Sequence, residues 1–354
     1  MSKVHNFSAG PSILAPEAFE KAIEAIRNFA GTGLSILEVS HRSKQFEQVM
    51  DDARAIVREL LQVPDTHETL FLQGGASSQF YMIPHNYLGT KAAYLNTGVW
   101  ASGAIKEAKL YGEVIEVASS KAQNFNYIPK NYEIPADADY FHCTSNNTIY
   151  GTQMRSFPKS PVPMICDMSS DIFSRPVQVA DFDLIYAGAQ KNMGPAGVTL
   201  VIFKKDKQPV SVRPIPSMLD YRIHLDKESM YNTPPAFAIL VSLYNLIWVK
   251  ECGGVAEMEK RANDRASLLY GEIDRNPLFK GTCAAEDRSH MNVCFVLQDE
   301  NPELEAKFMA ACKEAGISGI KGHRLVGGFR ASMYNALPLE STQALVNVMQ
   351  TFHS

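Results

Sequence analysis

The 354-residue sequence lacks the features of several specialised classes of protein. It has no excess of basic residues, since 34 Lys and Arg stand against 38 Asp and Glu and give a formal net charge of −4. This balance argues against a nucleic-acid partner and against a polybasic membrane-binding surface. The longest apolar run, residues 236–249, contains Ser, Tyr and Asn and is too short to span a bilayer, so it predicts a buried core helix. We therefore expect no membrane partner.

The sequence also lacks the signatures of secretion and of metal binding. No apolar segment typical of a signal peptide follows the first residues. The six cysteines form no CxxC pair and lie mostly in apolar runs, which predicts reduced, buried thiols in a cytoplasmic protein. None of the nine histidines forms an HxxxH motif or pairs with nearby cysteines at metal-site spacing, so we expect no metal.

Apolar periodicity predicts two amphipathic helices near the N-terminus. Residues 16–29 begin with a proline, which favours a helix start, and their apolar stripe contains Phe19, Ala22, Ile23, Ile26 and Phe29. Residues 46–61 repeat the pattern. The period then changes, and short apolar runs appear at residues 69–72, 92–96, 113–118, 139–143, 162–166, 183–187 and 198–203. Continuous rather than alternating apolar runs are typical of strands covered on both faces, so we expect an α/β fold with a mostly parallel sheet.

A second pattern follows in the C-terminal part of the chain. Helices are predicted over 234–252, between a Pro-Pro start and a Gly-Gly stop, and near 257–275. The elements predicted next are strand 291–297, helix 302–315, strand 329–334 and helix 338–352, which together indicate a smaller α/β domain. We therefore divide the chain into a large domain of residues 16–255 and a small domain of residues 1–15 and 256–354.

Five of the predicted strands run directly into polar or glycine-rich segments. These segments are Gln73–Ser78, Thr97–Trp100, Thr144–Thr148, Asp167 and Gln190–Lys191. Because ligands of open α/β sheets bind at the carboxyl ends of the strands, we expect the five segments to line one crevice. Lys191 is the most informative residue, since it follows an apolar strand and begins the tight turn "KNMGPAG", where a merely solvated amine is not expected.

Each of these features alone also has a plain structural interpretation. The glycine-rich turn is suited to a helix N-cap, Asp167 to a helix cap, and Trp100 to the core. Together, however, they match the needs of pyridoxal phosphate: Lys191 offers the amine for a Schiff base, Asp167 an anion beside the ring nitrogen, and Trp100 a flat face for the ring. A helix N-terminus suits the phosphate and a hydroxyl suits the phenolic oxygen. The residues predicted to make these last two contacts are Ala76 and Ser77 for the phosphate and Thr148 for the oxygen.

Five longer motifs carry a resemblance to a known family. The segments "FSAGPS", "SHRSKQF", "IYAGAQKNMGPAG", "YNTPPAFA" and "GHRLVGGFRASMYNALPLE" extend from residue 7 to about residue 340 and closely resemble the phosphoserine aminotransferases. These are pyridoxal phosphate enzymes of fold type I within the class V aminotransferases. The motif "AGAQK" alone would indicate only the wider class, with its desulfurase relatives. The resemblance implies a homodimer with active sites at the subunit interface.

The resemblance also implies roles for individual residues. Lys191 would carry the cofactor, Asp167 would pair with its ring nitrogen, Trp100 would stack on the ring, and Thr148 and Gln190 would contact it as well. Asn232 and Thr233 would reach the cofactor phosphate from the partner subunit. The residues implied for substrate binding are Ser8, His41, Arg42, His323, Arg324 and Arg330.

The implied reaction is transfer of the amino group of L-glutamate to 3-phosphohydroxypyruvate, which gives O-phospho-L-serine and 2-oxoglutarate in serine biosynthesis. The sequence leaves open whether the phosphorylated hydroxythreonine of pyridoxine biosynthesis is also a substrate. Many bacterial members carry an arginine where this chain has Ser77, so the sequence also leaves open which groups hold the substrate phosphate. Two alternatives are a cysteine desulfurase or lyase, for which no suitable thiol is evident, and a non-catalytic binding protein, which would be expected to lose Lys191 or Asp167.

Overall fold

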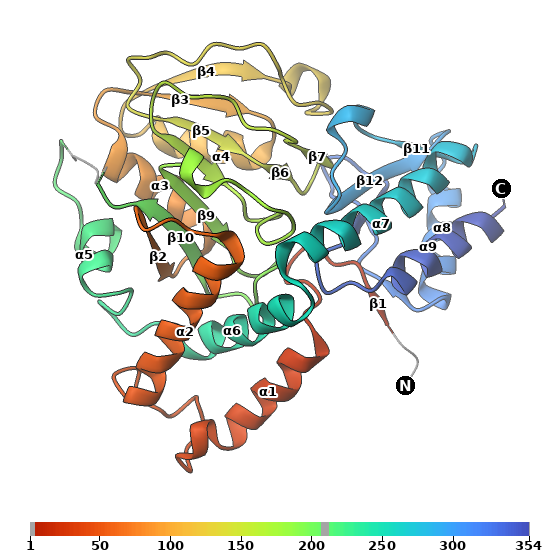
Figure 1. Ribbon diagram of the computed structural model, residues 1–354. Helices are drawn as coiled ribbons and strands as arrows, with labels where there is room; N and C mark the ends of the chain where they lie inside the picture. The colour runs from red at the N-terminus through yellow and green to blue at the C-terminus, as the bar shows by residue number, and fades with distance from the viewer. Residues whose placement is uncertain (1–3, 207–211, 354) are drawn as a thin grey trace.

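A seven-stranded sheet forms the centre of the structure, a computed structural model that describes residues 4–206 and 212–353. Its strands lie in the order β2-β10-β9-β8-β5-β3-β4, and of these only β10 runs antiparallel to its neighbours (Figure 1). The seven strands coincide with the seven apolar runs, so the predicted α/β fold with a mostly parallel sheet is confirmed. Their bounds are β2 (His67–Leu72), β3 (Lys91–Asn96), β4 (Glu113–Ser119), β5 (Phe141–Thr144), β8 (Met164–Asp167), β9 (Leu184–Gly188) and β10 (Thr199–Lys204).

Helices cover this sheet on both faces, which explains why its inner strands are mostly apolar; the edge strand β4, with Glu113 and Glu116, is only partly buried. On one face, α3 (Gly75–Tyr87) and α4 (Val99–Ala108) bury their apolar side chains against the strands. On the other face, α2 (Lys44–Leu61) and α6 (Ala236–Glu251) form the larger core of the molecule. All five residues of β9, near the middle of the sheet, are buried. Two-sided burial therefore fixes the strands, and with them the place where their carboxyl ends meet.

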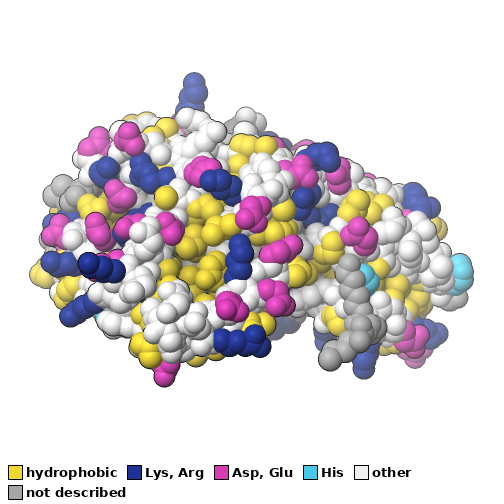
Figure 2. Space-filling view, turned by 60° about the horizontal axis from the view of Figure 1, so that its bottom comes forward, with side chains coloured by type: hydrophobic (Ala, Val, Ile, Leu, Met, Phe, Trp, Pro, Cys, Tyr) yellow, Lys and Arg dark blue, Asp and Glu magenta, His cyan; other side chains and the backbone are white. Residues whose placement is uncertain are grey.

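The N-terminal helix differs from its prediction. α1 (Pro16–Arg27) ends before residue 29, and Phe29 is buried in the short 3-10 segment η1 (Phe29–Gly31). The buried side chains of α1 are alanines, which allow close packing on α6, whereas Phe19, Ile23 and Ile26 are between 40% and 49% exposed. Figure 2 turns this end of the molecule toward the viewer and shows hydrophobic side chains gathered on its face, with charged side chains around them. The apolar stripe of the helix thus lies partly on the surface of the single chain.

A second, smaller core lies in the C-terminal part, coloured blue in Figure 1. A three-stranded antiparallel sheet of order β11-β12-β14 packs with three helices there, and the N-terminal strand β1 pairs in parallel with β13. We call this part the small unit and the rest the large unit. The predicted domain boundaries stay a prediction, and residues 1–3, 207–211 and 354 of the predicted domains lie outside the described residues. The elements are β1 (His5–Asn6), α7 (Gly254–Arg275), β11 (Phe279–Gly281), β12 (Asn292–Leu297), α8 (Pro302–Glu314), β13 (Ile317–Ser318), β14 (Phe329–Ser332) and α9 (Leu339–Thr351).

Shorter elements complete the chain. The two-stranded pair of β6 (Asn146–Asn147) and β7 (Thr152–Gln153) follows β5 and reaches the small unit through a bridge between Thr152 and Arg288. Within residues 4–206 and 212–353, no single helix is both long and apolar enough to cross a membrane, and only α6 and α7 meet these criteria as a pair, which is bent by 80°. The remaining elements are α5 (Tyr221–Asp226), η2 (Lys121–Gln123), η3 (Val179–Asp181), η4 (Ser217–Leu219) and η5 (Ala285–Asp287).

Candidate active site

A cavity of about 440 Å³ lies between the carboxyl ends of the central strands and the small unit. This volume falls in the range of protein cavities that hold small ligands. Its walls include segments that follow β2, β3, β5, β8 and β9, which are the five strand ends that the sequence marked as polar or glycine-rich. The five segments therefore do line one crevice, as predicted.

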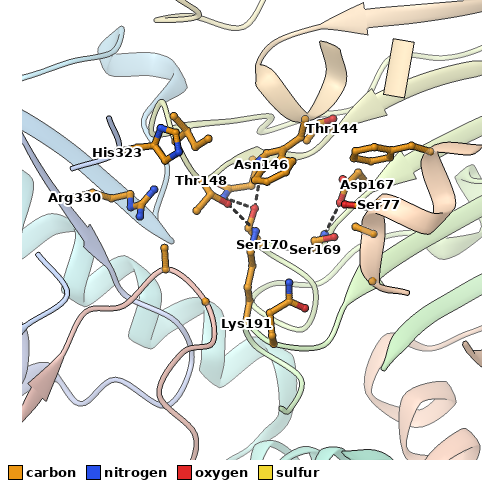
Figure 3. Close-up of a pocket in the computed structure, with 18 of the residues that line it drawn as sticks. Ser77, Thr144, Asn146, Thr148, Asp167, Ser169, Ser170, Lys191, His323 and Arg330 are labelled. Atoms are coloured by element: carbon orange, nitrogen blue, oxygen red, sulfur yellow. Dashed lines mark hydrogen bonds between the residues drawn. The ribbon is translucent and has the colours of Figure 1, made fainter. Parts of the chain in front are cut away.

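Lys191 projects into this cavity, where its Nζ donates a hydrogen bond to Thr148 Oγ1 at 2.8 Å (Figure 3). The turn that carries it is tight, because the N–H groups of Lys191 and Gly194 both donate to the Ala189 carbonyl, at 2.7 and 2.8 Å. A Cβ on Gly194 would lie 2.1 Å from Ser242 Oγ of α6, so no side chain fits there. Position 194 therefore requires glycine, because this turn packs closely on a core helix.

The amine of Lys191 loses its proton more readily than an exposed lysine does. Burial lowers the pKa of Lys191 to about 8; the Asp167 carboxylate opposes this shift, whereas the Arg330 guanidinium adds to it. An amine with this pKa is neutral in about one molecule in ten at pH 7, far more often than the amine of an exposed lysine. Lys191 is therefore suited to act as a nucleophile and as a general base.

Asp167 ends β8 and faces the cavity from the sheet side. It is 5% exposed, and its Oδ1 accepts a hydrogen bond from the Ser169 N–H at 2.9 Å. Burial raises the pKa of Asp167, while the hydrogen bonds from Ser169 and the charge of Lys191 lower it. A buried carboxylate is costly without a cationic partner. A ligand that presents a protonated ring nitrogen would supply that partner.

The start of α3 forms another wall of the cavity. Its N-cap, Gly74, provides no side-chain cap, so the first N–H groups of the helix, at Ala76 and Ser77 among others, have no partner within the helix. The positive end of the helix dipole lies at the same place, and together these features favour a bound phosphate. Gly74 has a φ of +91°, and a Cβ there would lie 2.7 Å from Ser78 Cβ, so the turn requires glycine.

Trp100 lies in the first turn of α4 and lines the cavity. It is 40% exposed, so it is not a core residue, although a tryptophan, of which the sequence has only two, usually suggests one. The aromatic side chain therefore offers apolar surface to a ligand in the cavity.

Two basic side chains approach from the opposite side, on segments of the small unit (Figure 3). Arg330 lies on β14; its Nε is buried without a hydrogen-bond partner, and no carboxylate among the described residues forms an ion pair with it. Burial and the charges of Arg330 and Arg324 lower the pKa of the neighbouring His323. A guanidinium without a partner in a cavity wall is suited to bind a carboxylate through two parallel hydrogen bonds.

The cavity brings together most of the residues predicted from the sequence. Those that line it are Ala76, Ser77, Trp100, Thr148, Asp167, Gln190, Lys191, His323 and Arg330. The others do not line it in the single chain: they are Ser8, His41, Arg42, Asn232, Thr233 and Arg324. Ser8 precedes the cavity residue Ala9, whereas His41 and Thr233 line a separate depression on the surface and Asn232 lines a third, small one.

The cavity also contains residues that were not predicted individually. Gly74, Gly75, Thr144 and Asn146 belong to segments that were expected to line the crevice, whereas the following residues do not: Ala9, Gly10, Phe80, Ile149, Ser169 and Ser170. Two of the latter could have been found, since Ser169 and Ser170 follow Asp167 at the end of β8. The rule that polar residues at strand ends face the ligand applies to them equally.

The N-terminal wall of the cavity could not be placed by that rule. Ala9 and Gly10 lie far from the other site residues in the sequence. They reach the cavity because Ser12 N donates to the Gln190 carbonyl at 3.0 Å and Ser12 Oγ to the Lys191 carbonyl at 2.5 Å. These bonds hold the N-terminal segment against the turn that carries Lys191.

Comparisons with known proteins agree with this geometry. The family model of class-V aminotransferases matches residues 4–345. The chain is 61% identical to the phosphoserine aminotransferase of Flavobacterium johnsoniae over 355 aligned positions, and 59% identical to that of Bacteroides thetaiotaomicron over 350, with 99% of each chain covered in both cases.

Solved structures agree as well. A phosphoserine aminotransferase from Bacillus circulans is 44% identical and superimposes with a TM-score of 0.95 over 99% of both chains. A phosphoserine aminotransferase from Trichomonas vaginalis with bound pyridoxal phosphate is 39% identical, with a TM-score of 0.94 over 98% of this chain and 100% of that one. The cavity with its lysine and its buried aspartate, the family match and these relatives lead to one conclusion: the chain belongs to the phosphoserine aminotransferase family of class-V aminotransferases.

Proposed function

We propose that this protein transfers the amino group of L-glutamate to 3-phosphohydroxypyruvate, with pyridoxal phosphate as cofactor, in the biosynthesis of serine. The observation that carries the proposal is the placement of the Lys191 amine in one cavity with the buried carboxylate of Asp167 on one side and the unpaired guanidinium of Arg330 on the other. Relatives at about 60% identity over nearly the whole chain carry the name of this activity.

The cavity fits pyridoxal phosphate at three points. The start of α3 has free N–H groups for the phosphate, the buried Asp167 lacks the cationic partner that a protonated ring nitrogen provides, and Trp100 exposes apolar surface for the ring. When bound, the cofactor supplies an aldehyde that takes up the amino group and a ring that withdraws electrons from the Cα of the substrate.

Lys191 has two tasks in this reaction. It would hold the cofactor when this is bound, and its Nζ, once free, would take a proton from Cα of L-glutamate as general base and pass it on to the cofactor as general acid. In the second half of the reaction the same amine returns a proton to Cα of the product. The hydrogen bond from Nζ to Thr148, at 2.8 Å, keeps the amine inside the cavity. Asp167 holds the proton on the ring nitrogen throughout.

The basic residues bind the anionic groups of the two substrates. Arg330 binds the α-carboxylate, which L-glutamate and 3-phosphohydroxypyruvate share. The second anionic group is a phosphate in 3-phosphohydroxypyruvate and a side-chain carboxylate in L-glutamate. Basic residues around the cavity mouth bind it. These are His323 and Arg324 of the same chain, together with the hydroxyl of Ser8, and His41 and Arg42 of the partner subunit.

We further propose that the enzyme is a homodimer with shared active sites. His41, Arg42, Asn232 and Thr233 lie away from the cavity of their own chain, so they can serve a site only by reaching into the cavity of a second copy. The exposed stripe of Phe19, Ile23 and Ile26 on α1 supplies apolar surface for such an association (Figure 2).

Light scattering tests the dimer. The unmodified protein is expected to have twice the mass of the chain, and Ile23→Glu to shift it toward the monomer with loss of activity, because a charge would be buried in the interface. Lys21→Glu, at an exposed position of the same helix, is the control and should remain a dimer. A dimeric Ile23→Glu variant would show that α1 lies outside the interface.

The desulfurase alternative finds no support among the described residues, because no cysteine lines the cavity. Cys166, next to Asp167, is fully buried, and burial raises its pKa well above the ordinary value of a thiol. All six cysteines are free thiols, which supports our proposal that the protein works in the reducing cytoplasm.

The proposed function is tested with purified protein and added pyridoxal phosphate. L-glutamate should bleach the yellow chromophore, 3-phosphohydroxypyruvate should restore it, and O-phospho-L-serine should accumulate during turnover. Release of sulfide from L-cysteine at a comparable rate, without transamination, would contradict the proposal in favour of the desulfurase.

A further inference from the structure

A buried network of polar side chains joins the two units beside the active-site cavity. We call it the junction network; its members are Asn146, Ser170, Ser289, Asn292, Ser332 and Tyr334. None of them is more than 3% exposed. Asn146 lines the cavity and belongs to the large unit, whereas Asn292 lies at the start of β12 in the small unit. The network thus spans the boundary across which Lys191 and Arg330 face each other.

Asn146 and Asn292 form its centre. Asn146 Nδ2 donates to Asn292 Oδ1 at 2.8 Å and to Ser170 Oγ at 2.8 Å. Asn146 Oδ1 accepts from Ser289 Oγ at 2.5 Å. On the large-unit side, Ser170 Oγ also donates to the Asn146 carbonyl at 2.8 Å, and Ser170 follows Asp167 on the segment after β8. The network is therefore tied to the segment that carries the buried carboxylate.

On the small-unit side, Asn292 is tied to the strand of Arg330. Asn292 Nδ2 donates to Ser332 Oγ at 3.0 Å and to Tyr334 Oη at 3.2 Å. Ser332 stands opposite Asn292 in the pairing of β12 with β14, and it lies two residues after Arg330, so both project from the same face of β14. Tyr334 Oη in turn donates to the carbonyl of Ala9, a cavity residue, at 2.9 Å.

The position of Arg330 depends on this anchoring. Its side chain has no carboxylate partner among the described residues and its Nε makes no hydrogen bond, so no contact of the guanidinium itself fixes the distance to Lys191. That distance is set by where β14 sits on the large unit. An asparagine side chain can serve as the link because it offers a donor and an acceptor at once, here to Ser332 and Asn146 respectively.

We propose that Asn292 is a positioning residue of the enzyme, which holds Arg330 at the correct distance from Lys191 by joining Asn146 to Ser332. The proposal rests on the role of Arg330 as the binding group for the α-carboxylate. Asn292 touches neither substrate nor cofactor; it acts through the strand that carries the arginine. Loss of the link should therefore weaken substrate binding and leave cofactor binding intact.

The test is the Asn292→Ala variant as holoenzyme. We expect the KM values for L-glutamate and for 3-phosphohydroxypyruvate to rise together by about tenfold or more, because both substrates share the α-carboxylate and displacements of about 1 Å have effects of this size or larger. The Kd for pyridoxal phosphate should stay unchanged and kcat should change less than KM.

Asn276→Ala is the matched control within the small unit. Asn276 Nδ2 donates to Glu272 Oε1 at 2.9 Å and to the Met349 carbonyl at 3.1 Å, and its Oδ1 accepts from the Leu278 N–H at 3.0 Å. This variant loses comparable hydrogen bonds away from the cavity, so it should lower Tm without raising either KM.

Three outcomes distinguish a wrong role for Arg330 from a wrong role for the junction network. If Arg330→Ala leaves KM unchanged, the proposed role of the arginine is wrong, and the junction proposal fails with it. If Arg330→Ala raises KM but Asn292→Ala does so no more than Asn276→Ala, only the junction proposal is overturned. Should Asn292→Ala not fold, Ser332→Ala removes one bond of the same link and must raise both KM values in the same direction, though by less; unchanged values would overturn the proposal.

Discussion

The substitution Asp167→Asn provides the sharpest test of the proposed chemistry. Asp167 is 5% exposed at the end of β8, and burial raises the pKa of its carboxyl group while the Ser169 hydrogen bonds and Lys191 lower it. Asparagine has nearly the same shape and can keep the hydrogen bond from the Ser169 N–H, now 2.9 Å long, through its amide oxygen. The change therefore removes the negative charge and leaves the packing in place.

The size of the effect follows from burial. Removing one partner of a buried ion pair costs about 3–5 kcal/mol. The ion pair is needed most when negative charge develops on the substrate Cα, so most of this free energy is added to the activation barrier. The rate of amino transfer should therefore fall by about 10²- to 10³-fold or more. The affinity for pyridoxal phosphate should fall by less, since Lys191 and the start of α3 still hold it.

Single-turnover kinetics with L-glutamate measure this loss, and absorbance titration measures cofactor affinity. Asp287→Asn is the control: Asp287 is 4% exposed, its Oδ2 accepts from the Ile128 N–H at 2.9 Å, its Oδ1 lies 3.3 Å from Lys130 Nζ, and it lies outside the cavity. It should lose stability and keep its activity. Transamination near the wild-type rate in Asp167→Asn would show that Asp167 only caps the following turn.

Three further predictions concern Lys191 and the substrate. Lys191→Ala should abolish turnover and leave the fold intact; borohydride reduction of the unmodified holoenzyme followed by peptide mapping must find the adduct on Lys191 and on no other lysine. Because burial lowers the pKa of Lys191 to about 8, the cofactor-free protein should capture the aldehyde of pyridoxal phosphate faster as pH rises through about 8, where the amine becomes neutral; a midpoint near that of an exposed lysine would refute this. Replacing 3-phosphohydroxypyruvate by hydroxypyruvate should lower kcat/KM by roughly 10³-fold, as expected when two or three charged hydrogen bonds are lost; a ratio near one would mean that the basic residues serve another anion.

Much of the fold could be predicted from the sequence because its main signal is simple. Strands buried on two faces are mostly apolar, and all seven predicted runs proved to be strands of the central sheet, including the partly buried edge strand β4. The first helix shows the limit of the method. Periodicity predicted a helix here, but it wrongly extended the helix to Phe29, and it could not tell that alanines would face α6 and that Phe19 and Ile23 would remain exposed. An apolar stripe indicates that one face of a helix is covered, but it does not say whether the covering surface belongs to the same chain.

The candidate site was predictable to the extent that its residues follow strands. Asp167 and Lys191 each stand where a buried strand ends, so their positions in the fold follow from the sequence. Ala9, Gly10 and the junction around Asn292 come from segments distant in the chain, and only tertiary packing brings them to the cavity. His41 and Thr233 line a depression separate from the cavity that holds Lys191.

The arrangement of charges across the cavity explains why the site needs both units. Asp167 approaches from the sheet and Arg330 from the small unit, with the Lys191 amine also facing the cavity (Figure 3). The two charges act on that amine in opposite directions, since Asp167 raises the pKa of Lys191 and Arg330 lowers it. A site with the large unit alone would retain the carboxylate and lose the guanidinium, so its lysine would be more often protonated and less able to accept a proton from Cα. The side chains that hold β14 against the sheet thereby influence the base as well as the binding of the α-carboxylate.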